Sequence, residues 1–148
     1  MNKRAFTMIE LLIVISIIAI LAAAIIPNFI GFDTEARVST TRSNVDTVRT
    51  RITLFRAKEG KYPASLGDLV DYTYLDSGVK KPYLNRIPAE MISDKRGNSS
   101  FEDIASDQPL SGKGGWVYII DRAELKVNVD KPLDKSWGSY ANEKPSDW

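Results

Sequence analysis

The feature that most restricts this 148-residue chain is an apolar segment of 21 residues, Phe6 to Ile26, with one charged side chain, Glu10. As a helix rising about 1.5 Å per residue it spans about 32 Å, enough to cross a hydrocarbon core of about 30 Å. Lys3 and Arg4 precede it directly, and the next basic residue is Arg37. The positive-inside rule therefore predicts a single membrane span with a cytoplasmic N-terminus and the rest of the chain outside.

The composition excludes several classes of site. The chain has no cysteine and no histidine, which excludes thiol nucleophiles, disulfides, Ser-His-Asp triads and zinc sites built on thiolate or imidazole ligands. Beyond residue 30 the chain holds 18 basic and 18 acidic side chains. Because proteins that bind nucleic-acid phosphates show an excess of basic residues, this balance weighs against nucleic-acid binding.

Three interpretations of the apolar segment compete. It is an ordinary signal peptide with an A-x-A cleavage site at Ala22 to Ala24, a plain membrane anchor, or a span in which Glu10 has a function. The third follows from the cost of a carboxylate in mid-bilayer, about 2.5–3.5 kcal/mol. Glu10 also has a simpler explanation, because Thr7 to Glu10 fits the S/T-x-x-E capping box that satisfies the first N–H groups of a helix.

The N-terminal residues also resemble a known family. The basic pair Lys3 and Arg4, then Ala5, then FTMIELLIVISIIAILAAAIIP is similar to the type III leader of bacterial type IV pilins and type II secretion pseudopilins. The resemblance implies that a prepilin peptidase cleaves between Ala5 and Phe6 on the cytoplasmic side. It also implies that Phe6 is then N-methylated.

The same resemblance assigns two further residues a role. It implies that Glu10 pairs with the terminal amine of a neighbouring subunit during assembly, and that Pro27 bends the helix. Two positions depart from the family pattern. Ala5 stands where a glycine usually precedes the cleavage site, and Ala19 stands where many pilins have a glycine that helps the helix to melt in the filament.

The resemblance also implies a location and partners. The chain would be a single-pass inner-membrane protein whose head lies in the periplasm, or outside the cell in a filament. Its partners would be copies of itself in a homo-oligomeric filament, the prepilin peptidase, an inner-membrane assembly platform, and minor pilins or pseudopilins. This interpretation predicts a structural subunit rather than an enzyme, and it leaves a type IV pilus and a type II secretion pseudopilus as alternatives.

After Pro27 the pattern becomes that of an amphipathic helix. Gly60 follows the last periodic residue and Pro63 comes shortly after, so the helix should end at Glu59. We expect one long helix from about Phe6 to Glu59, whose second half packs a stripe on a sheet. The stripe consists of Val38, Val45, Val48, Ile52 and Phe55, with Thr41 at a further position on it.

The segment KYPASLGDL, residues 61–69, resembles the YP-x-S-L-x-x-L segment of many pseudopilins, particularly the major one. Ser65 is expected to open a short helical turn that directs Leu66 and Leu69 toward the core. The tyrosines that follow are either contacts between subunits or, more commonly, amphipathic side chains that cover a small core: Tyr72, Tyr74 and Tyr83.

The C-terminal half predicts a small antiparallel sheet. Residues 93–115 are poor in apolar side chains and should form a loop. Residues 116–120 are apolar on both faces and predict a central strand. Residues 125–130 alternate between apolar and polar side chains and predict a half-buried strand. Residues 121–124 would join the two strands as a hairpin. We therefore expect an α+β, pilin-like fold, a long N-terminal helix packed on a small antiparallel sheet. Its predicted parts are a leader at 1–5, a transmembrane and polymerisation helix at 6–30, an amphipathic helix at 31–60 and a head at 61–148.

The tail from Lys131 to Trp148 carries weak candidates for a calcium site. Major pseudopilins bind calcium in a C-terminal loop, and Asp130, Asp134 and Ser136 offer oxygen ligands of the kind that calcium prefers. No ligand spacing supports a site, so a solvated acidic tail is the simpler explanation. The sequence predicts no other cofactor.

The sequence leaves other functions as alternatives to a filament subunit. One is a membrane-anchored or secreted α+β domain with an ordinary signal or anchor segment. A membrane-tethered enzyme would depend on carboxylates such as Asp68, Asp71 and Asp76, which only proximity in the sequence brings together. DNA binding would depend on three arginines spaced by seven, for which a solvated helix face is the simpler explanation: Arg42, Arg49 and Arg56.

Overall fold

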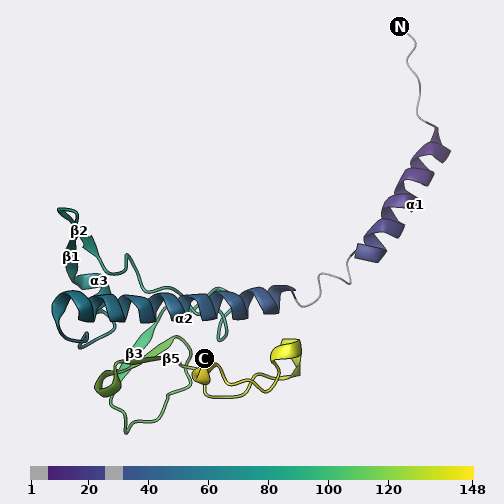
Figure 1. Ribbon diagram of the computed structural model, residues 1–148. Coiled ribbons are helices and arrows are strands. Elements are labelled where there is room, and N and C mark those ends of the chain that lie inside the picture. The colour runs from purple at the N-terminus through teal and green to yellow at the C-terminus, as the bar shows by residue number, and fades with distance from the viewer. Residues whose placement is uncertain (1–6, 26–31) are drawn as a thin grey trace. The chain divides into compact units, whose positions relative to one another are not determined.

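The computed structural model describes residues 7–25 and 32–148 (Figure 1). The chain divides into two compact units between Asp33 and Thr34. The second unit, called the head below, holds most of a long helix, two small sheets and several short helical turns. The predicted boundaries after residues 5 and 30 fall outside the described residues and stay predictions.

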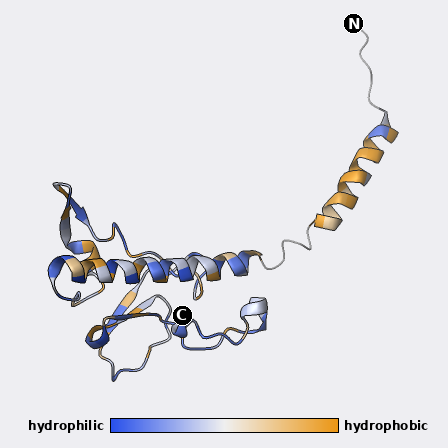
Figure 2. Ribbon diagram, viewed as in Figure 1, coloured by the Kyte–Doolittle hydropathy of each residue, from blue (hydrophilic) through white to orange (hydrophobic). Residues whose placement is uncertain are grey.

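The first helix, α1, runs from Met8 to Ile25 and contains no buried residue. Apolar residues make up almost all of this helix, and Figure 2 colours its ribbon orange along most of its length, with blue in the first turn. Eighteen residues give a helix of about 27 Å. By length and composition it is able to cross a membrane. A helix that is apolar on every side requires lipid or other protein around it.

The second helix, α2, runs from Phe32 to Glu59 and is amphipathic. Its buried residues are the six predicted for the stripe, so the predicted stripe is confirmed: Val38, Thr41, Val45, Val48, Ile52 and Phe55. The helix ends where expected, because Gly60 takes a φ of +74° and donates its N–H to the carbonyl of Arg56 at 2.9 Å. The predicted continuity from Phe6 to Glu59 and the bend at Pro27 concern residues outside the described ranges and stay predictions.

A three-stranded sheet lies on one side of α2 (Figure 1). Its central strand β4, Trp116–Ile119, is buried throughout and pairs antiparallel with β5, Glu124–Val127. The connection is the short 3-10 helix Ile120–Arg122, so the predicted hairpin is confirmed. The α+β class, with a long helix packed on antiparallel strands, is confirmed as well.

The third strand corrects one prediction. Strand β3, Phe101–Ile104, pairs parallel with β4 and lies within residues 93–115, which were expected to be a loop. Its two central residues are acidic, which hides the strand from a hydropathy pattern. Asp103 accepts hydrogen bonds from the Ser65 hydroxyl at 2.5 Å and the Leu66 N–H at 3.0 Å, and these partners are distant in the sequence.

A second, separate sheet was not predicted. Strands β1, Thr73–Asp76, and β2, Val79–Pro82, form an antiparallel hairpin that follows the short helix α3, Asp68–Asp71. Ser77 and Gly78 both have positive φ, +52° and +83°, as a two-residue type I′ turn requires. The Ser-Gly pair between TYLD and VKKP was the available signal.

The core lies between α2, α3 and the three-stranded sheet. Tyr83 is buried and donates its hydroxyl to Glu59 at 2.6 Å, while the ring of Tyr74 lies 4.8 Å from that of Tyr83. The exposed Tyr72 contacts Phe55 edge-on. These contacts place the tyrosines over the core. Two short 3-10 helices complete the chain, η3 at Lys135–Tyr140 and η4 at Pro145–Asp147.

Candidate functional site

The only charged side chain of α1 is Glu10, in its first turn. The N–H and the hydroxyl of Thr7 both donate to Glu10 Oε2, at 3.3 and 3.1 Å, and the Glu10 N–H donates to Thr7 Oγ1 at 3.2 Å. This is the reciprocal capping box that the S/T-x-x-E pattern predicts. The carboxylate also lies at the end of the helix where the macrodipole favours negative charge.

Within the described residues, the donors that the capping box offers to Glu10 are neutral. Both bonds from Thr7 reach the same oxygen, and both donors are uncharged. In apolar surroundings a carboxylate is stabilised more strongly by a cationic donor than by a neutral one. A terminal amine from another copy has the chemistry to complete this site. Lys3, Arg4, Ala5, Phe6 and Pro27 lie outside the described residues, so the basic pair, the cleavage, the methylation and the bend stay predictions.

The three arginines considered for DNA binding have partners within the head. Arg42 donates to Glu143 at 2.5 Å and stacks over Trp148, 4.7 Å from the ring centroid. Arg49 donates to the Leu125 carbonyl at 3.0 Å, and Arg56 donates to the Tyr62 hydroxyl at 2.6 Å. These guanidinium groups fasten other segments to α2, which weakens the DNA-binding hypothesis.

Two of the three carboxylates considered for enzyme chemistry, Asp68 and Asp76, also serve the fold. Asp68 accepts hydrogen bonds from the N–H groups of Ala64 and Ser65, at 2.7 and 3.1 Å, and so closes the turn before α3. Asp76 forms an ion pair with Lys81 at 2.7 Å across the β1–β2 hairpin, and this contact lowers the pKa of Asp76. Both carboxylates therefore support local structure.

The calcium candidates likewise have protein partners. Asp134 Oδ1 accepts from the N–H and the hydroxyl of Ser136, at 2.8 and 2.5 Å, which caps η3 and lowers the pKa of Asp134. Asp130 lies 3.6 Å from the ammonium of Lys144. Across residues 7–25 and 32–148, no three acidic side chains form a group that could hold a metal ion. The calcium site stays a prediction that these contacts do not support.

Glu90, in the segment that precedes β3, is a fully buried carboxylate that no sequence pattern predicted. Its Oε2 accepts from the N–H groups of Ile92 and Ser93 at 2.6 and 3.0 Å. Its Oε1 accepts from the N–H of Gly115 at 3.0 Å and from the Ser93 hydroxyl. Glu90 therefore ties residues 90–93 to the start of β4. No local pattern marks it, because Gly115 lies 25 residues away.

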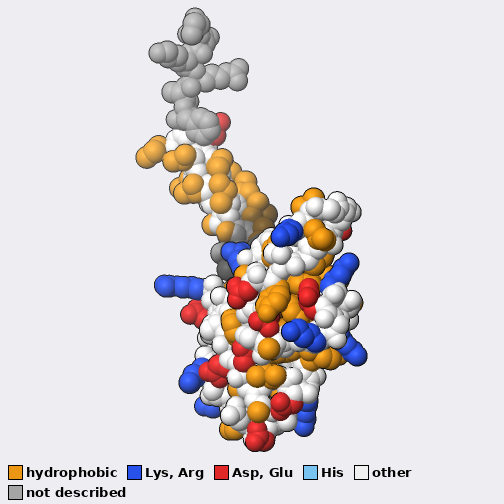
Figure 3. Space-filling model, turned by 90° about the vertical axis from the view of Figure 1, so that its left-hand side faces the viewer, with side chains coloured by type: hydrophobic (Ala, Val, Ile, Leu, Met, Phe, Trp, Pro, Cys, Tyr) orange, Lys and Arg blue, Asp and Glu red, His pale blue; other side chains and the backbone are white. Residues whose placement is uncertain are grey.

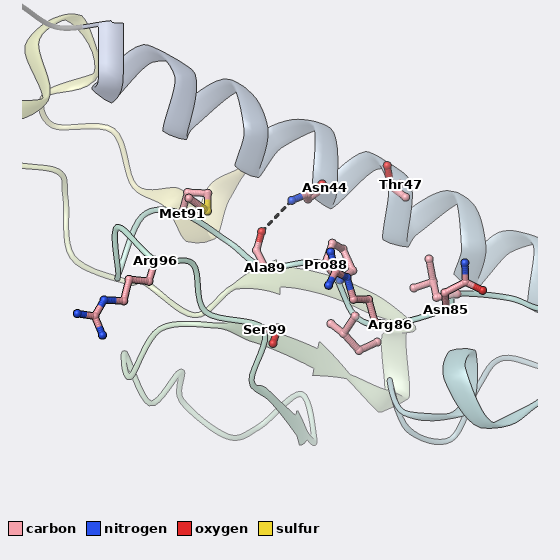
Figure 4. Close-up of a pocket in the computed structure, with 11 residues that line it drawn as sticks. Asn44, Thr47, Asn85, Arg86, Pro88, Ala89, Met91, Arg96 and Ser99 are labelled. Carbon is pink, nitrogen blue, oxygen red and sulfur yellow. Dashed lines mark hydrogen bonds between the residues drawn. The ribbon is translucent and has the colours of Figure 1, made fainter.

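A groove of about 620 Å³ lies between α2 and residues 84–99 (Figure 4). Asn44 on α2 bridges to the far wall by donating to the Ala89 carbonyl at 2.8 Å, and Arg96 extends away from α2. The charged residues of the lining are Arg86 and Arg96. The groove thus offers hydrogen-bond donors and positive charge, but no carboxylate to act as a base.

Comparison with known proteins identifies the N-terminal segment. Residues 1–26 match the family model described as the prokaryotic N-terminal methylation motif. The chain is 42% identical over 61 residues to the type IV major pilin protein PilA of Myxococcus xanthus, covering 41% of this chain and 28% of that protein. It is 43% identical over 61 residues to the type IV major fimbrial protein FimA of Dichelobacter nodosus, covering 40% and 39%.

A longer alignment relates the chain to a secretion protein. It is 27% identical over 96 residues to the type II secretion system core protein G of Escherichia coli, covering 60% of this chain and 66% of that protein. This share exceeds the 59 residues that precede Gly60, so the alignment includes residues beyond the end of α2. Each of these alignments spans less than two thirds of the relative. No solved structure matches the chain significantly. The predicted resemblance to type IV pilins and type II secretion pseudopilins is confirmed.

Proposed function

We propose that this chain, which carries a prepilin-type methylation motif, is a structural subunit of a type IV pilin-like filament. The observation that carries the proposal is α1, a membrane-length helix that is apolar on every side, has no buried residue and holds Glu10 in its first turn. Such a helix is satisfied by lipid before assembly and by the helices of other copies afterwards. The likeness to PilA, FimA and core protein G supports the same function.

The pathway of the chain follows from this proposal. It spans the inner membrane with its N-terminus in the cytoplasm, where a prepilin peptidase cleaves after Ala5 and methylates Phe6. An assembly platform and minor subunits then bring copies together, and the head lies in the periplasm or outside the cell. The role is structural rather than enzymatic, as the names of the relatives suggest.

Glu10 sets the register of assembly in this proposal. Among the described residues of one copy, its carboxylate accepts hydrogen bonds from the neutral donors of Thr7. In the filament the terminal amine of a neighbouring copy supplies the cation, and the ion pair forms only when the helices are correctly staggered. An unpaired carboxylate in the helix bundle is costly, which disfavours other registers.

The test compares Glu10→Ala with the matched control Ser16→Ala. Ser16 is the other polar side chain along α1, and its hydroxyl bonds within the helix to the Leu12 carbonyl at 2.7 Å. We expect Glu10→Ala to be processed normally but to yield few or no filaments, and Ser16→Ala to yield normal amounts. Electron microscopy of sheared cells and spheroplasts measures the yield. Normal filaments from Glu10→Ala would overturn the proposed role of Glu10.

The mass of the mature N-terminus separates the function from its alternatives. N-methyl-Phe6 is expected for a filament subunit, Ile25 for an ordinary signal peptide, and Met1 for a plain anchor. The second choice, between a surface pilus and a secretion pseudopilus, is tested by deleting the gene. The longest of these alignments is the one with core protein G, which favours the pseudopilus. Loss of exoprotein secretion with intact surface pili is therefore the expected phenotype.

A further inference from the structure

The β1–β2 hairpin exposes large apolar side chains on the surface of the head. It forms its own two-stranded sheet beside the C-terminal end of α2 (Figure 1). Leu75 is 63% exposed and Val79 is 58% exposed, more than any other large apolar side chain in the described part of the head. The exposed Lys80 follows Val79. Figure 3, which turns this end of the molecule toward the viewer, shows hydrophobic side chains beside basic ones.

Contacts within a single copy of the chain hold the hairpin in shape. Its turn is the type I′ turn at Ser77 and Gly78. Lys81 and Asp76 form an ion pair across the strands at 2.7 Å. At its base the ring of Tyr74 packs against Tyr83. Because the hairpin already holds its shape, binding it requires little ordering entropy.

A groove with complementary chemistry lies elsewhere on the head. It has a volume of about 440 Å³ and lies beside η4. Pro132 and Trp148 supply apolar surface, and Glu143 and Asp147 supply carboxylates. The lining also holds Lys144, whose ammonium lies 3.6 Å from Asp130. Glu143 already pairs with Arg42. Asp147 is exposed, and its carboxylate receives only a long hydrogen bond, 3.5 Å, from the Ser146 hydroxyl within the described residues, so it is available to a cation.

The hairpin and the groove lie at different points along α2. Tyr74 of the hairpin lies over Lys58, 5.8 Å from the ammonium to the ring centroid, whereas Glu143 and Trp148 of the groove contact Arg42. Sixteen helical residues separate Arg42 from Lys58, which corresponds to about 24 Å. A contact between two different, displaced surfaces is heterologous, and repeating it produces an open filament rather than a closed dimer.

We infer that the β1–β2 hairpin of one copy docks into the groove beside η4 of the next copy. Leu75 and Val79 meet the apolar surface of Pro132 and Trp148, and Lys80 pairs with Asp147. The inference rests on the proposed function, because it assigns one contact between the heads of a filament. The occupant is a second copy because the two surfaces complement each other in charge and apolarity and are placed so that the contact propagates.

Crosslinking tests the contact directly, because the chain has no cysteine of its own. A variant with Lys80→Cys and Asp147→Cys is assembled into filaments and treated with a short bis-maleimide reagent. We expect a ladder of covalent multimers on a denaturing gel. Each single variant should stay monomeric, as should a control pair of Lys80→Cys with Lys113→Cys, whose second position is 78% exposed at its side chain. Dimers from Lys80→Cys alone would show a hairpin-to-hairpin contact and overturn the inference.

Charge reversal provides a second, independent readout. Lys80→Glu and Asp147→Lys should each reduce filament yield about tenfold by placing like charges together, and the double variant should recover to within about twofold of the unmodified chain. Both positions are exposed, so tryptophan fluorescence of the variants should be unchanged. If filaments form but give no ladder of crosslinked multimers, and the double charge-reversal variant does not recover its yield, the docking contact is refuted and the proposed function is not. The proposed function is judged separately, by the mature N-terminus and by Glu10→Ala.

Discussion

Replacing the buried Glu90 by glutamine keeps its shape and removes its charge, which makes it a sharp test of how the head is held together. The four donors around Glu90 all point toward its two oxygens. Glutamine replaces one carboxylate oxygen by an NH₂ group. This group is itself a hydrogen-bond donor, so it would face N–H or O–H groups that also donate. The less costly orientation places the NH₂ group against Gly115 and Ser93, because the Ser93 hydroxyl can rotate to accept a hydrogen bond.

The magnitude follows from these contacts. In that orientation the N–H of Gly115 loses its acceptor, which costs about 1–3 kcal/mol at a buried site. The remaining bonds, from Ile92 and Ser93, lose the extra strength that a charged acceptor provides. Part of this loss is offset because the neutral amide needs less hydration than the carboxylate. We expect the free energy of unfolding to fall by about 2–4 kcal/mol.

Urea unfolding of the full chain in detergent micelles, followed by tryptophan fluorescence, measures this change. All three tryptophans lie in residues 116–148, so the signal reports on the head. The matched control is Glu124→Gln, whose side chain is 39% exposed and pairs with Lys126 at 3.4 Å. Its effect should stay within about 0.5 kcal/mol. Equal free energies of unfolding for the two variants would refute the reasoning.

Two further predictions concern the same sheet. Gly115→Ala should destabilise the head by at least about 2 kcal/mol more than Gly112→Ala, because a Cβ at Gly115 would lie 2.3 Å from the Ser100 carbonyl oxygen, while Gly112 has a similar φ and open space. Urea midpoints measure the difference, and equal midpoints would contradict the packing argument. Burial raises the pKa of Tyr118 from 10.0 to about 12, so the folded head keeps a proton that the unfolded chain loses between these values. The free energy of unfolding should therefore fall as the pH rises from 10 to 12, and Tyr118→Phe should show a shallower fall in the same titration; an unchanged slope would count against this assignment.

The elements that the sequence predicts correctly are those whose pattern is local. The α2 stripe repeats at helical spacing and is buried residue for residue. The β4–β5 hairpin combines a continuous apolar run with an alternating one. Thr7 and Glu10 are three residues apart, so their capping box is also visible in the sequence. In each case neighbouring residues contain the whole signal.

The missed elements depend on partners far along the chain. Strand β3 is acidic at its centre, and its Asp103 is satisfied by Ser65 and Leu66, more than 35 residues earlier. The Glu90 carboxylate accepts from the N–H of Gly115, which lies 25 residues away and which only the fold brings close. Arg42 and Arg49 resemble a solvated helix face until the tertiary structure places the C-terminal segment against them.

By itself, the sequence determined that this chain has an N-terminal helix able to cross a membrane, a glutamate at its start, an amphipathic helix that ends just before Gly60 and a β-hairpin near the C-terminus. Periodicity, capping and hydropathy act over a few residues, so the printed order of residues contains them. Only the tertiary structure decided which charged side chains serve the fold and which stay available on the surface. That distinction depends on burial and on the donors that surround each group, and both are created only when distant segments pack together.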